Sequence, residues 1–129
     1  MSEQNKELVR RFYEEVENEG NLDLVDELVD PNFRDVYNFA SPFPVRGVDG
    51  IKQLVTALRS RDNFHLTIEE LIAEGDKVVA RLSSSRTVQT PTGEQVKTQL
   101  VEILRIANGK LLERWVIIDM GPRPQTAAS

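Results

Sequence analysis

The sequence predicts an α+β fold in which the helices precede the strands. Apolar residues recur at helical spacing up to about residue 61, whereas beyond residue 63 they alternate with polar residues at the period of a strand. Short turns separate the alternating stretches, and Asn108-Gly109 is a strong signal for a two-residue hairpin. Strands joined in this way form an antiparallel sheet, and the segregated helices are expected to cover one face of it.

Three helices are expected in the N-terminal half. Gly20 ends the first, whose apolar stripe contains Leu8, Val9, Phe12, Tyr13 and Val16. The second is short, begins after Asn21 and ends at Pro31, because the residue before a proline disfavours the helical conformation. A loop or irregular strand rich in aromatic residues follows over residues 32–48, and a third helix over residues 49–61.

Four main strands complete the domain, with expected ranges of residues 64–73, 77–89, 94–107 and 110–120. If this sheet is strongly bent and the helices lie across its mouth, the two layers enclose a pocket. We expect a single domain over residues 1–121. A flexible tail is expected over residues 122–129, where two prolines interrupt a polar sequence.

The composition excludes several classes of protein. The 129 residues include 16 Lys and Arg against 21 Asp and Glu, and the net charge of −5 argues against a nucleic-acid partner. No apolar run approaches the roughly 18 residues that span a bilayer, and no signal segment is present, so we expect a cytoplasmic protein without a membrane partner. The chain has no cysteine and one histidine, His65, so we expect no metal and no cofactor.

The Asn108-Gly109 turn sets the expected register of the last hairpin. If Ala107 pairs with Lys110, then Glu102 lies opposite Trp115 on one face of the sheet. That face is the expected core side because it carries the apolar residues Leu100, Leu104, Ile106, Leu111, Trp115 and Ile117. The opposite face is expected to be exposed and includes Lys97, Gln99, Arg105 and Arg114.

In this register two carboxylates point toward the core. Glu102 and Asp119 are about 13 Å apart along the strands, at about 3.3 Å per residue, a spacing that suits groups flanking a small ligand. Burial raises the pKa of a carboxyl group, which makes both residues candidates for acid–base chemistry. A single bulge near the turn would reverse this parity and send both to solvent.

Several stretches resemble the SnoaL-like polyketide cyclase family, which belongs to the superfamily of nuclear transport factor 2 (NTF2) and ketosteroid isomerase. They are residues 9–16, 19–23, 28–33, 73–81 and 103–115, followed by Asp119. The resemblance implies an NTF2-like cone, in which a bent antiparallel sheet surrounds a hydrophobic pocket, and it implies a homodimer. It identifies the fold more specifically than the reaction, because members of this superfamily perform different chemistry.

The resemblance also suggests site residues. Asp119 matches the acid–base aspartate on the last strand of the cyclases, and Asp35 occupies the place of the isomerase base. Tyr13 and Glu102 fall at the positions of the isomerase pair that stabilises the enolate oxygen. Two histidines of the cyclases are replaced, by Val36 and Arg114. The Arg-x-Asp motif of related epoxide hydrolases is incomplete, because Ser83 follows Arg81-Leu82.

The remaining candidate residues are expected to line or gate the pocket, and they are Trp115, Ile117, Tyr37, Asn38, Phe39 and Phe43. Our first hypothesis is an enzyme without cofactor that abstracts a proton α to a carbonyl of a small apolar substrate. The enolate then cyclises or is reprotonated. The alternative is a non-catalytic protein that binds a small apolar ligand, and a weaker alternative is hydrolysis of an epoxide.

Overall fold

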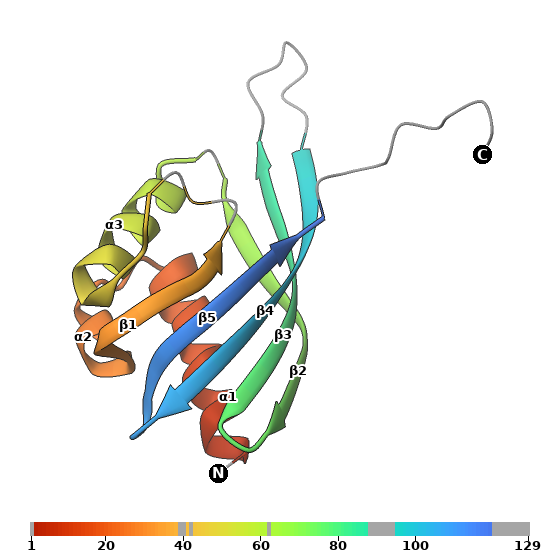
Figure 1. Ribbon diagram of the computed structural model, residues 1–129. Coiled ribbons are helices and arrows are strands. Elements are labelled where there is room, and N and C mark those ends of the chain that lie inside the picture. Colours follow the sequence, from red (N-terminus) through yellow and green to blue (C-terminus); the bar gives the residue numbers. More distant parts are fainter. Residues whose placement is uncertain (1, 39–40, 42, 62, 88–94, 120–129) are drawn as a thin grey trace, which may run out of the picture.

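The computed structural model describes residues 2–38, 41, 43–61, 63–87 and 95–119. It confirms the α+β class: helices lie against one face of a curved five-stranded sheet (Figure 1). The helical segments are α1 (Ser2–Arg11), the π-helix η1 (Phe12–Asn18), α2 (Asp23–Leu28) and α3 (Gly47–Arg59). The strands are β1 (Val29–Asn38), β2 (His65–Glu74), β3 (Lys77–Thr87), β4 (Gln95–Ala107) and β5 (Lys110–Ile118).

Strand β1 corrects two expectations, because the sequence predicted a helix up to Pro31 and then a loop or irregular strand. Helix α2 ends at Leu28, and β1 pairs in parallel with β5, so the order in the sheet is β1-β5-β4-β3-β2. The sheet therefore has five strands rather than four and is not purely antiparallel. Pro31 is tolerated because β1 lies at the edge, where a missing N–H need not break the sheet.

The first helix changes its hydrogen-bonding pattern at Phe12. Helix α1 continues directly into η1, a π-helix, and Gly20 ends this helical run with φ of +77°. The expected glycine stop is therefore confirmed. Segment η1 buries Phe12, Tyr13, Val16 and Glu17, so one charged residue lies among its buried side chains.

The last hairpin confirms the predicted turn and contradicts the predicted register. Asn108 and Gly109 both have positive φ, 53° and 75°, as a type I′ turn requires, and Ala107 pairs with Lys110. One pair further on, a bulge intervenes: Ile106 lies opposite Leu111, but Arg105 lies opposite Glu113. Leu112 is therefore an additional residue in β5, which reverses the faces of everything that follows it.

The bulge leaves the side-chain orientations of β4 as predicted and reverses those of β5 after Leu112. Glu102 is buried as expected and lies opposite Val116 rather than Trp115. Arg114, expected at the surface, is buried, whereas Ile117 is 52% exposed on the opposite face. We call the face that packs against the helices the inner face and the other the outer face.

The core lies between the inner face and the helices. Its large fully buried side chains include Phe12, Tyr13, Phe33, Ile51, Leu82, Leu104 and Leu111. Each such side chain contributes about 1.5–3 kcal/mol relative to an exposed one. None of the helices in the described part of the chain is long and apolar enough to cross a membrane.

Candidate functional site

Arg114 is the centre of a charged cluster beneath the helices. Because of the bulge, β5 directs this side chain to the inner face, where it is 2% exposed. Its guanidinium carbon lies 6.0 Å from the centroid of the Phe12 ring and 5.9 Å from that of Phe33. The two rings restrict the guanidinium and offer cation–π attraction, which is stronger away from water.

Asp35 of β1 makes the closest contacts with this arginine. Arg114 donates through Nε to Oδ1 at 2.7 Å and through Nη2 to Oδ2 at 2.9 Å, which is a bidentate pair. Asn38, three residues further along β1, donates to Oδ2 at 2.8 Å. The Asp35 side chain is 3% exposed, so the parallel pairing of β1 with β5 places a buried ion pair between neighbouring strands.

Two more carboxyl groups meet the remaining guanidinium nitrogen. Glu102 of β4 accepts through Oε1 from the Tyr13 hydroxyl at 2.7 Å and from Arg114 Nη1 at 3.3 Å. Glu17 of η1 lies 3.5 Å from the same Nη1. We call Arg114, Asp35, Glu102, Glu17 and Tyr13 the Arg114 cluster; its members come from four elements of the fold.

The electrostatics of the cluster follow from burial and from its unequal charges. Burial, followed by the proximity of Glu102, raises the pKa of Glu17 to about 8. Burial also raises the pKa of Glu102, although Arg114 and the Tyr13 hydroxyl oppose that shift. Burial and the charge of Glu102 raise the pKa of Tyr13 well above 10. Burial lowers the pKa of Arg114, but the surrounding carboxylates outweigh it, so this arginine stays charged.

The structure brings four of the predicted residues together and leaves another apart. Tyr13, Asp35, Glu102 and Asn38 all belong to the cluster or contact it. Asp119 is exposed beyond the end of β5, with its backbone N–H donating to the Gln99 carbonyl at 2.9 Å. The expected inward orientation of Asp119 is therefore wrong, because the bulge shifts the strand by one residue.

The predicted pocket-lining residues do not lie together in the structure either. Trp115 and Ile117 lie on the outer face, since Arg114 and Val116, which alternate with them along β5, are buried on the inner one. Tyr37 pairs with Trp115 and is 52% exposed. Phe43 packs against the core, whereas Phe39 lies outside the described residues. Among the described residues of this set, Asn38 contacts the Arg114 cluster.

Two members of the cluster, Glu17 and Arg114, were not among the predicted site residues. Glu17 lies four residues after Tyr13 and one after Val16, so it shares the buried side of the first helix. An acidic residue in an apolar stripe was the signal that could have found it. Arg114 carried no such signal, because its orientation depends on the bulge.

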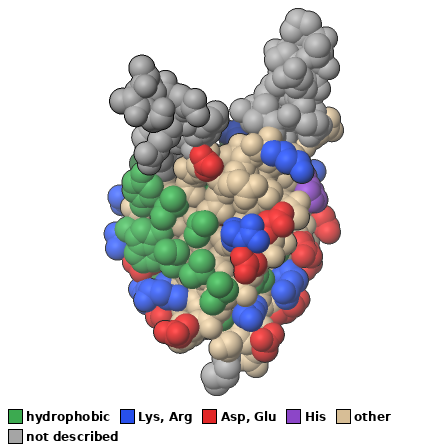
Figure 2. All heavy atoms as spheres, turned by 90° about the vertical axis from the view of Figure 1, so that its right-hand side faces the viewer, with side chains coloured by type: hydrophobic (Ala, Val, Ile, Leu, Met, Phe, Trp, Pro, Cys, Tyr) green, Lys and Arg blue, Asp and Glu red, His purple; other side chains and the backbone are tan. Residues whose placement is uncertain are grey.

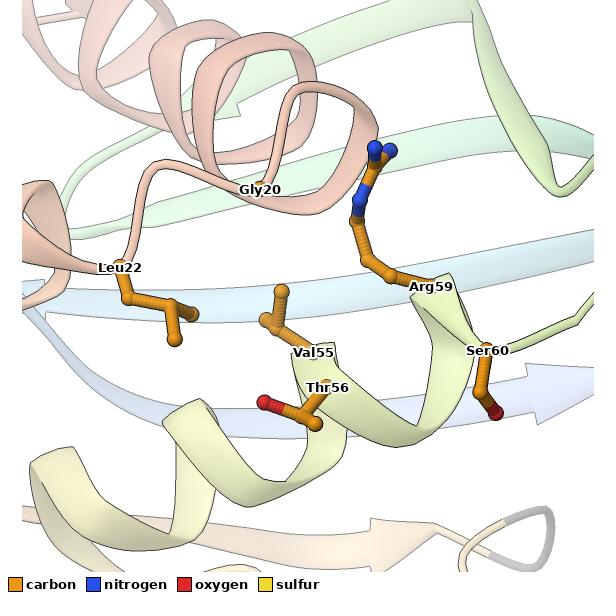
Figure 3. A pocket seen from close by; sticks show the side chains of 6 residues that line it. All are labelled: Gly20, Leu22, Val55, Thr56, Arg59 and Ser60. Atoms are coloured by element: carbon orange, nitrogen blue, oxygen red, sulfur yellow. The ribbon is translucent and has the colours of Figure 1, made fainter.

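A separate pocket lies between the turn after η1 and helix α3 (Figure 3). It has a volume of about 310 Å³ and is lined by Gly20, Leu22, Val55, Thr56, Arg59 and Ser60. Arg59 reaches back to the Asn18 carbonyl and contributes to its wall. The Arg114 cluster is not part of this pocket, which therefore differs from the conical pocket that the sequence predicted.

The described residues contain no group of three or more His, Cys, Asp or Glu side chains arranged to hold a metal ion. The three carboxyl groups of the cluster surround Arg114, so a protein cation occupies their common centre. Their arrangement suits a site in which protons and a fixed guanidinium balance the negative charge.

A curved sheet with helices against one face, and with a buried polar cluster between them, defines an NTF2-like α+β domain. The sequence model of the family described as SnoaL-like polyketide cyclase matches residues 7–124. The chain belongs to this family. No curated protein sequence matches it.

Solved structures agree with this assignment. A proposed polyketide cyclase from Acidithiobacillus ferrooxidans is 28% identical, with a TM-score of 0.80 over 91% of this chain and 89% of that one. One from Bacillus cereus ATCC 10987 is 30% identical, with a TM-score of 0.74 over 90% and 74% of the two chains. A proposed SnoaL-like cyclase from Jannaschia sp. CCS1, 23% identical, has the same fold, with a TM-score of 0.77 over 92% and 88%.

Proposed function

We propose that the chain is a cofactor-independent enzyme that moves a proton at a carbon next to a carbonyl group. The resulting enolate of a small hydrophobic substrate then undergoes aldol cyclisation or is reprotonated as an isomer. The observation that supports this proposal is the Arg114 cluster, which holds a buried carboxylate and a second buried acid around one cation. The family and the names of its relatives favour cyclisation.

In this mechanism Asp35 is the base. Arg114 and Asn38 fix its two oxygens, so the carboxylate accepts the substrate proton with little reorganisation and returns it to carbon or to the cyclised product. Asn38 is half-buried, whereas the Asp35 side chain is 3% exposed. The substrate is therefore expected to approach from the Asn38 side of the cluster.

Glu102 in its protonated form is the proposed donor to the developing enolate oxygen. Its Oε1 already accepts from Tyr13 and Arg114, which leaves Oε2–H to donate to the substrate. Burial raises the pKa of Glu102 and so favours the protonated form. Tyr13 supports this donor through its hydroxyl, rather than by direct contact with the substrate.

The test is hydrogen–deuterium exchange at the α-carbon of β-keto esters and polycyclic ketones in heavy water, followed by proton NMR. Replacement of Asp35 by Asn should slow exchange by about 10²-fold or more, the usual contribution of a general base. Asp119→Asn is the matched change at the exposed aspartate, whose own catalytic role stays a prediction from the sequence. A larger loss at Asp119 than at Asp35 would assign the base to Asp119 and contradict the proposed role of Asp35.

The alternative is a protein that binds a small apolar ligand without chemistry. The complete pairing of Asp35 favours it, because a carboxylate with three donors can be purely structural. Ligand-induced NMR shifts without exchange in the wild type would support this reading. Epoxide hydrolysis has less support, because Arg81 is exposed and pairs with Glu70 rather than with the cluster.

A homodimer is the partner arrangement that we propose, with the outer face of the sheet as its interface. Paired positions form an apolar row across all five strands: Ile72, Val79, Ile103, Trp115 and Tyr37. Ile72 is 58% exposed, and Figure 2 shows hydrophobic side chains gathered as a band among charged ones. An apolar centre with a charged rim is the anatomy of a protein interface.

The row beside it indicates a second copy as the partner. It carries both signs of charge, on Glu74, Lys77, Arg105, Glu113 and Arg34, so two copies related by a twofold axis can match opposite charges. Ile117→Lys should convert the dimer to a monomer in sedimentation velocity, whereas Gln53→Lys, at an exposed position of helix α3 and away from the outer face, should not. A monomeric wild type, or a dimer unaffected by Ile117→Lys, would contradict this interface.

A further inference from the structure

The Arg114 cluster has more acids than its one cation can neutralise. Arg114 contacts Asp35, Glu102 and Glu17, and these side chains are between 2% and 6% exposed. Two unbalanced negative charges would remain if all three carboxyl groups were ionised. An unpaired charge in the interior is costly, and a carboxyl group avoids that cost by keeping its proton.

The hydrogen bonds rank the three acids. Asp35 accepts from three donors, at 2.7, 2.9 and 2.8 Å. Glu102 accepts from two, at 2.7 and 3.3 Å. In the part of the chain that the structure describes, Glu17 has one donor, Arg114 Nη1 at 3.5 Å. Since donors stabilise a carboxylate, Glu17 is the acid with the least support for its charged form.

We propose that Glu17 is a positioning residue that holds a proton at neutral pH and sets the alkaline limit of the site. Neutral Glu17, together with the protonated Glu102 of the proposed mechanism, leaves the positive charge of Arg114 to the Asp35 carboxylate. Ionised Glu17 competes with Glu102 for Nη1, because both contact that nitrogen. It also adds a negative charge beside the place where the proposed enolate forms. The effect on activity rests on the proposed function, whereas the proton on Glu17 does not.

The groups that surround Glu17 favour its protonated form. Burial raises the pKa of Glu17 to about 8, with further increases from Glu102 and Asp35 and an opposing effect of Arg114. Tyr13 faces the cluster from the same helix, as a neutral hydroxyl whose pKa is well above 10. Elements α2, α3 and β2 also pack near η1, and the half-buried Lys52 among them pairs with Asp26. Their other ionisable residues are exposed: Asp23, Asp26, Glu27, Asp49, Arg59, His65, Glu69, Glu70 and Glu74.

The first test is the pH dependence of stability, which needs no substrate. Unfolded Glu17 has a pKa of 4.5 and the folded group one of about 8, so the folded state binds the extra proton between these values. Wild-type stability should therefore decline, relative to Glu17→Gln, as the pH rises from about 4.5 to about 8, and the difference should then level off.

Urea unfolding at a series of pH values measures this difference. Glu14→Gln is the matched control, because Glu14 is exposed on the same helical segment, and its difference from the wild type should stay constant. A constant difference for Glu17→Gln as well would overturn the proposal.

A second test observes the proton on Glu17 directly. Burial raises the pKa of Glu102 as well, so more than one glutamate can titrate above the usual range. In wild-type protein labelled with ¹³C at the glutamate side-chain carboxyl carbons, the Glu17 resonance should titrate near pH 8. In Glu17→Gln that resonance should be absent. If no glutamate carboxyl titrates above about pH 6, Glu17 is ionised at neutral pH and the proposal is wrong.

The pH profile of α-proton exchange tests the effect on activity. The wild-type rate should fall above about pH 8, by up to about tenfold per pH unit, whereas Glu17→Gln should keep its rate to higher pH. The same alkaline fall in both proteins would overturn the positioning role. If neither protein catalyses exchange, the proposed function fails, and the two titrations still decide whether Glu17 carries the proton.

Discussion

Strand β5 carries two arginine–carboxylate groups on opposite faces, centred on the adjacent residues Glu113 and Arg114. On the outer face, two arginines serve one acid: Arg105 donates to Glu113 at 2.8 Å and Arg34 at 3.1 Å. On the inner face, one arginine serves three acids. The outer group is accessible to water, whereas the inner side chains are nearly inaccessible.

This difference reverses the direction of the pKa shifts. The hydrogen bond from Arg105, together with the one from Arg34, lowers the pKa of Glu113. Burial raises the pKa values of Glu17 and Glu102, despite their contacts with Arg114. The same pair of residue types therefore acts as a surface ion pair on one face and as a proton-holding cluster on the other. Burial and the ratio of cations to acids decide which role results.

The largest expected effect on stability comes from removing Arg114, the cation of the inner face. Arg114→Met keeps much of the side-chain length but leaves three buried acids without a cation, which should cost about 3–5 kcal/mol of unfolding free energy near neutral pH. The loss should shrink at lower pH, because the acids then take up protons. Urea unfolding at two pH values measures both effects.

Arg105→Met is the matched change on the outer face. Because its partner Glu113 keeps Arg34 and water, the loss should be a small fraction of that at Arg114. Equal losses at the two arginines would show that the inner cluster is not distinguished by its burial, and the comparison between the faces would fail.

The smallest expected effect concerns the acid of the outer group. The pKa of Glu113 is lower in the folded state than its unfolded value of 4.5. Its contribution to stability is therefore present above about pH 4.5 and lost as the pH falls through the folded value, opposite in direction to the effect of Glu17. Glu113→Gln should reduce the unfolding free energy slightly at pH 7, and less so at acid pH or in high salt.

The control for this variant is again Glu14→Gln, at an exposed glutamate without an ion pair among the described residues. A Glu113→Gln effect that does not change with salt would mean that the outer group behaves like a buried one.

The helices and the hairpin could be predicted because their signals are local. The apolar stripe placed the first helix, Gly20 ended it, and Asn108-Gly109 formed the predicted turn. The inward orientation of Glu102 was also correct, because β4 keeps its alternation of apolar and polar side chains on the inner face. In each case a period or a single backbone preference within a few residues carries the information.

The parallel edge strand could not be predicted in the same way. Residues 29–38 contain Pro31 and several polar residues, and they become a strand by pairing with β5, far along the chain. Such long-range pairing has no local signature, since backbone hydrogen bonds to a distant strand do not depend on side-chain period. The same pairing brings Asp35 beside Arg114, so the predicted base has a partner that its sequence neighbours do not reveal.

The sequence by itself determined the α+β class, the turn of the last hairpin and the positions of Tyr13 and Glu102, because these depend on patterns within single elements. The tertiary structure alone decided that Leu112 is the additional residue of a bulge, which buries Arg114 and turns Trp115, Ile117 and Asp119 away from the core. It also decided that four elements bring three acids to one arginine. The physical reason is that a shift of one residue reverses every following side chain of a strand, and the charge state of a buried group depends on partners that only the complete fold supplies.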